Sequence, residues 1–365
     1  MTVAHLMRAL SLVAVASFLL ALYFIKRGIQ PLVPRHLSRT VTEDITRLGG
    51  GNTDESLTFQ YSDYFQMTNA KHINSRPLQV STSMMEKFQF PWTLIDNLNS
   101  DNVKDFVFVT ANSENHFDES LDAIATVQKF FPRHKLLYYD WGLKAFQKEK
   151  IEKLCGVQYK PFNFEEFPGA TIITGRPYYQ AHKIFVILDA LFHHPGVYWI
   201  DASIRFKSSD LSSAYRTVIG NQGIAFFSRT IHSTFAATHP DIYVYFPTNV
   251  TAQKTLYMAE TNNMLIYKTR RVFEGFLWWM FLCGLHAECV TPTLETECNK
   301  PKGVMDKWLK CNRADQSVAN VLVSNLYGFD DSKYYCPLDR DNVLMVLRKV
   351  SNMYELRECP TDTTI

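Results

Sequence analysis

The sequence predicts an α/β domain built around a mostly parallel sheet with helices on both faces. Two observations carry this prediction. From about residue 105 onward, short apolar runs of strand length alternate with amphipathic patterns of helical period. The resulting order is βαβαβαβ over about 100 residues, and strands joined by helices pair in parallel. A Rossmann-like sheet covered on both sides is therefore expected.

The elements of this unit follow from local patterns. The first strand is an almost uninterrupted apolar run, the helix after it ends at Pro132, and the last helix ends at Pro195-Gly196. Runs of this kind are typical of strands buried on both faces. The predicted strands are 105–112, 135–142, 157–164 and 196–206, and the predicted helices are 118–132, 145–156 and 180–194.

Further elements follow toward the C-terminus. Residues 223–229 and 262–270 are predicted strands, and 314–328 is the last clear helix. The aromatic segment 272–285 resembles a membrane span at first sight. It is too short to cross a bilayer and contains Glu274, so we expect a buried core helix.

The N-terminus predicts a membrane anchor. Residues 9–25 contain no charged side chain and are flanked by Arg8 and by Lys26-Arg27. This length is at the lower limit for a helix that spans a hydrocarbon core of about 30 Å. A cleaved signal peptide is the alternative, but the small residues lie inside the run and not after it. Both interpretations direct the remaining chain into the secretory pathway.

The orientation of this anchor follows from the distal chain. The positive charges after the segment would favour a cytoplasmic C-terminal part. Against this, Asn249-Val250-Thr251 is a glycosylation sequon, which has meaning only in the lumen. Six cysteines also gather in the last quarter, and an even cluster suggests disulfides of open connectivity. These six are Cys283, Cys289, Cys298, Cys311, Cys336 and Cys359.

Other interpretations of the cysteines are weaker. Zinc usually needs a tighter pair of ligands, and the sequence contains no Cys-x-x-Cys. Cys155 stands apart at the end of a helical pattern, and we expect it to be a small buried apolar side chain. The lumenal orientation is therefore preferred.

The amino-acid composition indicates how the chain is divided and which partners are not expected. Lysine and arginine total 38 against 36 acidic residues, so nucleic acid is not an expected partner. Residues 28–100 are rich in Ser, Thr, Asn and Pro and include a Gly49-Gly50-Gly51 run, which is typical of a stem. We therefore expect a cytoplasmic tip and signal-anchor helix at 1–27, a stem at 28–100 and a lumenal domain at 101–365.

Candidate site residues lie where the predicted strands end, because ligands bind at the carboxyl ends of strands in open parallel sheets. Thr110 and Asn112 follow the first strand, and Asp140 follows the second. Asp201 and Ser203 follow the apolar strand before them. In nucleotide-sugar enzymes of the GT-A type this place carries an Asp-x-Asp motif that holds Mn or Mg against the donor's diphosphate. Ser203 replaces the second aspartate, so Asp201 and Ser203 are the candidate metal ligands. A simple turn cap also explains Asp201.

Two helices supply further candidates. Asp315 and Gln316 open the last helix, where they either cap free N–H groups or face a sugar or an acceptor hydroxyl. Lys183, on the helix before the Asp201 strand, either points its ammonium at a phosphate or lies on a solvated face. The sequence has no Gly-x-Ser-x-Gly, no P-loop and no GxGxxG after the first strand. These absences exclude the common hydrolase, NTPase and dehydrogenase classes.

Several segments together resemble a family of poorly characterised animal membrane-anchored proteins that look like GT-A glycosyltransferases. The similar stretches are FVFVTANSENHFDESLDAIATVQKFFP, LLYYDWGL, VYWIDASIRF, THPDIYVYFP and CNRADQSVANVLVSNLYG. They cover about 105–335, and the most specific piece contains Cys311, Arg313, Asp315, Gln316 and Ser317.

The resemblance implies a Golgi or ER membrane protein with a lumenal transferase-like domain. It points to Thr110 and Asn112 for the nucleotide, Asp140 for its ribose or base, and Asp201 for the metal and diphosphate. Glu260 and Asp315 would lie on the sugar and acceptor side. The first hypothesis is therefore a glycosyltransferase using a nucleotide sugar. The second is an inactive lumenal binding module or chaperone, because Ser203 departs from the motif.

Overall fold

The computed structural model describes residues 40–48, 56–65, 74–167, 172–173, 176–177, 179–293, 295, 298 and 303–360. They belong to a compact unit spanning Arg39–Ile365. The predicted anchor at 9–25 lies outside the described residues and stays a prediction. Among the helices of the described part, none is both long and apolar enough to cross a membrane.

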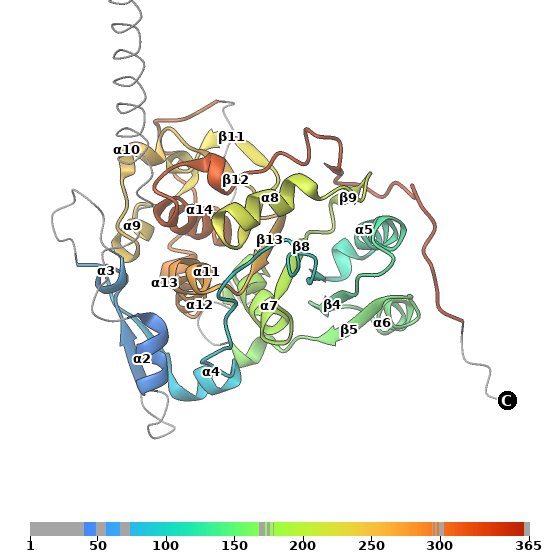
Figure 1. The fold of residues 1–365 in the computed structure, drawn as a ribbon, viewed down its shortest axis with the longest axis horizontal. Helices are drawn as coiled ribbons and strands as arrows, with labels where there is room; N and C mark the ends of the chain where they lie inside the picture. Colours follow the sequence, from blue (N-terminus) through green and yellow to red (C-terminus); the bar gives the residue numbers. More distant parts are fainter. Residues whose placement is uncertain are drawn as a thin grey trace, which may run out of the picture. The chain divides into compact units, whose positions relative to one another are not determined.

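A six-stranded sheet forms the centre of this unit (Figure 1). The strand order is β10-β13-β8-β3-β4-β5. β8, β3, β4 and β5 pair in parallel, whereas β13 is antiparallel to both β8 and β10. The prediction of a mostly parallel sheet is confirmed. The strands are β3 (Val107–Asn112), β4 (Leu136–Asp140), β5 (Val157–Pro161), β8 (Gly196–Ile200), β10 (Ile224–Phe226) and β13 (Asn263–Tyr267).

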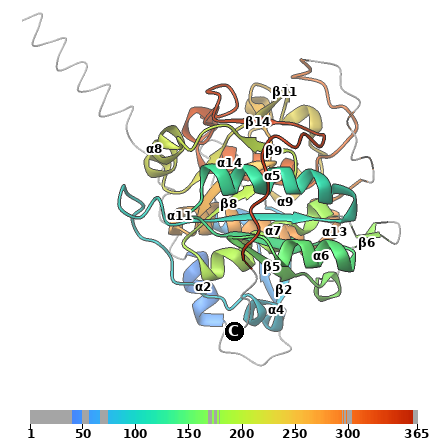
Figure 2. The same cartoon turned by 90° about the vertical axis from the view of Figure 1, so that its right-hand side faces the viewer.

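Helices cover both faces of the sheet, as expected (Figures 1 and 2). Side chains of α7, α12 and α14 share one apolar cluster with alternate residues of the central strands. Side chains of α5, α6 and α8 share the other cluster with the residues in between. The helices are α5 (Phe117–Phe130), α6 (Ala145–Glu152), α7 (Tyr179–His193), α8 (Ser212–Asn221), α12 (Trp278–Gly284) and α14 (Asp315–Leu326).

The aromatic segment is a core element, as predicted. It comprises α11 (Arg270–Val272), a π-helical stretch (Phe273–Leu277) and α12. Trp278 is fully buried, and its ring meets that of Phe59 edge to face with centroids 5.0 Å apart. The apolar character of this segment therefore reflects packing inside the domain.

The segment predicted as a stem differs from that prediction from residue 40 onward. Val41, Ile45 and Tyr61 are almost fully buried in the cluster that contains α12. The segment is mostly polar, but its few aromatic and aliphatic side chains pack in the same cluster as α12. The elements here are α2 (Val41–Leu48), β1 (Ser56–Phe59), α3 (Tyr61–Tyr64), β2 (Leu78–Ser81) and α4 (Thr82–Lys87).

Short elements complete the described fold. β9 (Ile204–Phe206) follows β8 and pairs antiparallel with β14 (Leu344–Val346). β11 (Arg229–Ser233) pairs with β12 (Tyr257–Ala259). The others are β6 (Ile172–Ile173), β7 (Arg176–Pro177), α9 (Ile242–Tyr245), α10 (Val250–Gln253) and α13 (Ala287–Val290).

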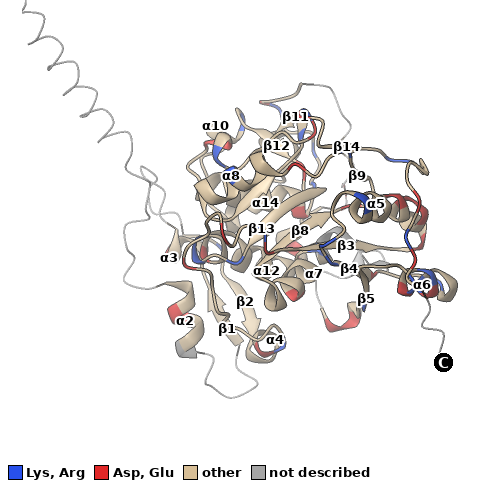
Figure 3. Ribbon diagram, turned by 45° about the vertical axis from the view of Figure 1, so that its right-hand side comes forward, with Lys and Arg blue, Asp and Glu red and all other residues tan. Residues whose placement is uncertain are grey.

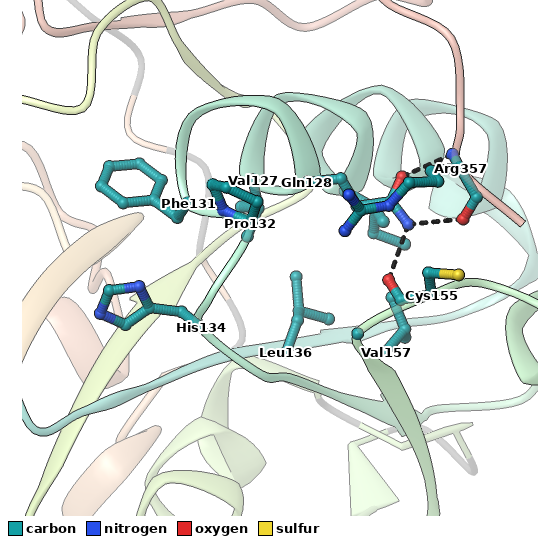
Figure 4. A pocket seen from close by; sticks show the side chains of 11 residues that line it. Val127, Gln128, Phe131, Pro132, His134, Leu136, Cys155, Val157 and Arg357 are labelled. Atoms are coloured by element: carbon teal, nitrogen blue, oxygen red, sulfur yellow. Dashed lines mark hydrogen bonds between the residues drawn. The ribbon is translucent and has the colours of Figure 1, made fainter. Parts of the chain in front are cut away.

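The C-terminal strap, defined here as residues 344–360, lies along α5. Asp122 accepts hydrogen bonds from the backbone N–H groups of Ser351 and Asn352. Farther along, Gln128 donates from Nε2 to the carbonyls of Cys155 and Arg357, 2.8 Å each, and accepts from Arg357 N–H (Figure 4). A disulfide between Cys155 and Cys359 then fixes the strap to the chain just before β5.

The cysteine prediction needs correction at two positions. Five of the six predicted candidates form disulfides, but Cys359 pairs with Cys155, which we expected to be a free buried side chain. Cys336 is buried and not disulfide-bonded. Closeness along the chain does not report closeness in space, and the strap brings together two cysteines 204 residues apart. The remaining pairs are Cys283–Cys289 and Cys298–Cys311.

Loss of the long-range disulfide should destabilise the chain more than loss of the short one. Closing a long loop removes more entropy from the unfolded chain, and such bonds contribute about 2–4 kcal/mol. Cys155→Ala/Cys359→Ala should therefore lower the free energy of unfolding more than Cys283→Ala/Cys289→Ala, whose cysteines are 6 residues apart. Urea titration of both variants measures this, and a larger cost for the short pair would contradict it.

Candidate functional site

Lys183 lies on α7, the helix packed between the sheet and α12. Because both neighbours are apolar, α7 is buried along nearly its whole circumference, and Lys183 itself is only 7 % exposed. The interpretation of a solvated face is therefore wrong. A buried ammonium needs partners of opposite charge, and it finds them in Asp201 and Asp315.

Four oxygens surround the Lys183 ammonium. Nζ lies 3.3 Å from Asp201 Oδ1 and 3.3 Å from Asp315 Oδ2. It also donates to the carbonyl oxygen of Thr261 at 3.1 Å and lies 3.4 Å from the hydroxyl of the same residue. We call Lys183, Asp201, Asp315 and Thr261 the lysine cluster. Four separate segments of the chain converge in it.

Asp201 extends directly from the carboxyl end of β8. Its Oδ1 accepts a hydrogen bond from Trp199 Nε1 at 2.7 Å, and its backbone N–H donates to the carbonyl of Asn262 at 2.8 Å. Its side chain is 38 % exposed, compared with 9 % for Lys183 and 6 % for Asp315. Asp201 is therefore the member of the lysine cluster through which a ligand can reach it.

Asp315 is the first residue of α14. Its Oδ2 accepts from the Thr261 hydroxyl at 2.8 Å. The residue before it, Ala314, is fully buried and has φ 44° and ψ −119°, a conformation that costs a non-glycine residue about 1–3 kcal/mol. Asp315 thus serves the lysine cluster, and it stands in the first turn of α14, where an acidic side chain also favours the free N–H groups of the helix start.

The charged groups of the lysine cluster affect one another's pKa. Burial by itself would lower the pKa of Lys183, but the charges of Asp201 and Asp315 outweigh it, and the pKa is raised above its ordinary 10.5. Burial raises the pKa of Asp315, against the opposing effect of Lys183. Lys183 is therefore a permanent cation at neutral pH.

Surface charges are arranged differently. Acidic and basic residues are mixed along α6 (Figure 3). Lys153 pairs there with Glu149 at 2.7 Å, and both side chains are at least half exposed. Pairs of this kind contribute little to stability. Burial thus separates the lysine cluster from ordinary surface ion pairs.

Glu260 lies beside the lysine cluster. Its Oε2 accepts from Asn262 Nδ2 at 2.9 Å, and the carbonyl of Asn262 holds Asp201 in place. The Asn262 side chain also accepts from Ser228 at 2.8 Å. Glu260 is half-buried, so it combines a fixed position with access to solvent.

The predicted nucleotide residues Thr110 and Asn112 do not join this group. Both are buried, and Asn112 Nδ2 donates to Thr110 Oγ1 at 3.0 Å. The pleat of β3 turns their side chains to the α5 face, whereas Asp201 lies on the α7 face with Trp199. They share the carboxyl edge of the sheet with Asp201 but not its face.

Asp140 and Gln316 have local surroundings. Asp140 Oδ1 accepts from the backbone N–H groups of Gly142 and Leu143, and Oδ2 accepts from Tyr159, so its observed contacts are those of a turn cap. Gln316 is 7 % exposed, and its Nε2 has no hydrogen-bond partner in the structure. Neither residue contacts the lysine cluster through a hydrogen bond.

The residues present do not fit a divalent cation in the predicted way. Ser203, predicted with Asp201 as a ligand, is buried, and its carbonyl accepts from Leu347 N–H at 2.7 Å. One oxygen of Asp201 is occupied by Trp199 and Lys183. In the part of the chain that the structure describes, no three His, Cys, Asp or Glu side chains gather in a way that could hold a metal ion.

Sequence reasoning missed two residues. Thr261, which contributes two oxygens to the lysine cluster, stands in a polar Glu-Thr-Asn-Asn run before an apolar strand, and that run was the available signal. Arg205 is fully buried and donates to the carbonyls of Ala202 and Ile204, which supports the turn after Asp201 from behind. Nothing in the local sequence distinguishes Arg205 from a surface residue.

A small cavity borders the lysine cluster. Lys183, Thr261 and Asp315 line one side of it, and apolar side chains such as Met264 and Met280 line the other. Its volume of about 10 Å³ is enough for about one water molecule. A larger ligand must therefore approach from the exposed side of Asp201.

The model of a family described as "Protein of unknown function (DUF1647)" matches residues 53–176, roughly a third of the chain. No curated protein matches the sequence significantly.

Several solved structures are similar in outline. The galactosyltransferase LgtC has a TM-score of 0.38 at 14 % identity, over 66 % of this chain and 87 % of that one. Mouse xyloside xylosyltransferase 1 has a TM-score of 0.36 at 10 % identity, over 67 % of this chain and 85 % of that one. Core-mannan synthase A from Aspergillus fumigatus, in its Mn/GDP form, has a TM-score of 0.37 at 8 % identity, over 63 % of this chain and 72 % of that one. These likenesses are remote, so an activity must be inferred from the chain's own residues.

Proposed function

We propose that this chain is a lumenal glycosyltransferase that moves a sugar from a nucleotide-sugar donor to a glycan, protein or lipid acceptor. One observation carries the proposal: Asp201 and Asp315 meet around Lys183 at the carboxyl end of the parallel strand β8. Open parallel sheets bind ligands at this end. Buried, mutually paired charges next to an exposed carboxylate are also typical of functional sites.

The roles of the residues follow from their exposure. Asp201 is the exposed carboxylate and is proposed to contact the donor, with Lys183 and Trp199 fixing its orientation. Glu260 is half-buried and proposed to accept the proton of the acceptor hydroxyl, since a general base must reach the group it deprotonates. Asp315 is buried and is proposed to orient Lys183. Thr110, Asn112 and Asp140 remain proposed donor contacts that the resemblance supports. Gln316 remains a proposed donor contact because it follows Asp315 at the start of α14.

Activity of the full-length chain tests this proposal. Incubation with a panel of nucleotide sugars should release the nucleoside diphosphate, and Asp201→Asn should lower the rate by about 100-fold or more, the scale of a positioned catalytic group. Asp96→Asn is the matched control, because that side chain is 87 % exposed and should leave the rate unchanged. Equal rates for wild type and Asp201→Asn, or no turnover of any donor, would count against the proposal.

A non-catalytic binding module is the second candidate. It is favoured by Ser203 at the second motif position and by the engagement of Asp315 with Thr261 and Lys183. Such a protein would keep the fold and bind a glycan or a partner without turnover. If Asp201→Asn abolishes a cellular glycan phenotype while the protein still folds, this candidate fails.

The proposed location is the Golgi or ER membrane, with a single N-terminal anchor and a lumenal C-terminal domain. Three disulfides support an oxidising compartment. Asn249 supports a glycosylating one, because it is exposed at the start of α10 and only its side-chain oxygen is used, as the acceptor for Ala252 N–H.

The glycosylation site predicts a simple result. Wild-type chain expressed in a secretory cell should shift to lower mass on treatment with an N-glycan-cleaving endoglycosidase. Asn249→Gln should already run at the lower mass and not respond, since the sequence has no other sequon. A wild-type chain that does not respond to the enzyme would argue against a lumenal domain.

A further inference from the structure

The oxygen cage around Lys183 has the dimensions of an ammonium site. The four oxygens contributed by Thr261, Asp201 and Asp315 lie 3.1 to 3.4 Å from Nζ. Divalent ions need closer oxygens, about 2.0–2.1 Å for Mg²⁺ and about 2.3–2.6 Å for Ca²⁺. The ammonium of Lys183 thus occupies the position between these oxygens that a bound cation would take.

The surroundings disfavour a second cation. The Lys183 ammonium is held close to Asp201, so a divalent ion on that carboxylate would be repelled by it. Ser203 offers a neutral hydroxyl where the motif has a second carboxylate. It also lies buried, with its carbonyl bonded to the strap at Leu347.

We propose that Lys183 is the resident cation of this site and that the ligand at Asp201 is bound without a divalent metal ion. The identity of that ligand rests on the function proposed above. Two carboxylates and one ammonium leave one negative charge, located on the exposed side chain of Asp201. A carboxylate accepts hydrogen bonds, so its partner is a hydroxyl of the sugar or ribose and not the diphosphate.

Titration with Mn²⁺ alone tests this directly. The full-length wild-type chain should show no one-to-one binding of Mn²⁺ at Mn²⁺ concentrations up to about 1 mM, which excludes even a weak site. Asp201→Asn should give the same calorimetric heats. One-to-one binding with a Kd of about 0.1 mM or tighter that disappears in Asp201→Asn would overturn the proposal.

A variant gives a positive readout. Lys183→Ala removes the ammonium and makes room between Asp201 and Asp315, so a folded variant should bind Mn²⁺ at least about tenfold more tightly than wild type. A folded variant with no gain would contradict the assignment of Lys183 as the cation. If the variant does not fold, the comparison of wild type with Asp201→Asn still decides the question.

Nucleotide binding separates this proposal from the function on which it rests. Thermal shift with a nucleoside diphosphate and its sugar derivative should be the same in Mn²⁺ and in EDTA, with affinities within about twofold. Binding only in Mn²⁺ would overturn the metal-free site and leave the transferase proposal standing. No binding in either condition would count against the transferase proposal, while the Mn²⁺ titration still decides the metal question.

Discussion

Replacement of Lys183 by methionine should lower the free energy of unfolding by about 3–5 kcal/mol, the usual cost of removing one partner from a buried ion pair. Asp315 would then be left as a buried carboxylate, 4 % exposed, that keeps the hydrogen bond from the Thr261 hydroxyl but has lost its cation. Methionine keeps most of the side-chain volume, so the loss reports charge and not a cavity. Urea denaturation followed by circular dichroism measures it.

Lys153→Met is the matched control for this prediction. Lys153 and Glu149 form an exposed pair, and such pairs contribute about 0–1 kcal/mol. The pH dependence gives a second check. Because the folded pKa of Lys183 is raised, its contribution is complete below its ordinary 10.5 and is lost as pH rises through the folded value. Equal costs for Lys153→Met and Lys183→Met at neutral pH would show that the lysine cluster is not a stabilising unit.

Replacement of Arg205 by methionine should also cost about 3–5 kcal/mol, because it leaves the buried carboxylate of Asp122 without its cation. Arg205 is fully buried, and its Nη2 lies 3.5 Å from Asp122 Oδ2. Its guanidinium also bonds the carbonyls of Ala202 and Lys349, which ties the turn after Asp201 to the C-terminal strap.

The loss at Arg205 should be visible at two places. Hydrogen exchange should quicken in the strap and in the turn after Asp201, and remain unchanged in the distant α12. Arg270→Met is the control, because this arginine is about half exposed and pairs with Asp96 at 3.7 Å and with Glu274 at 3.8 Å, outside the Asp122 site. Faster exchange spread evenly over the domain would mean that Arg205 supports the whole fold and not this turn.

Much of the central fold could be predicted from local patterns. The alternation of apolar strands and helices between 105 and 206 indicated the parallel part of the sheet, because β3, β4 and β8 are buried on both faces and read as apolar runs. The aromatic helix around Trp278 was distinguished from a membrane span by its length. The reversed direction of β13 was not predictable, since the hydrophobic period of a strand does not encode its direction.

The missed features depend on contacts between distant segments. The predicted stem looked like a spacer, yet Tyr61 and Phe59 pack on the aromatic helix. Cys155 looked like an isolated core residue because its partner Cys359 is 204 residues away. Chain composition carries little information about such pairings.

The candidate site could be predicted only in part. Lys183, Asp201 and Asp315 were each singled out from their position at an element's end or on a helix, but nothing local indicated that they meet. Thr110 and Asn112 lie at the expected edge of the sheet, but their side chains point to the face opposite Asp201. Residues two apart in a strand share one face, as their mutual hydrogen bond shows. The sequence pattern did not indicate which of the two faces that would be. Thr261 became significant only through its contact with Lys183.

Hydrogen–deuterium exchange of the full-length chain with a saturating nucleoside diphosphate sugar tests the central claim most directly. If the lysine cluster is the donor site, protection should appear in residues 200–206, 259–263 and 313–317, and it should be lost in Asp201→Asn. Protection confined to other segments, or protection at these segments that survives Asp201→Asn, would contradict the assignment of the site.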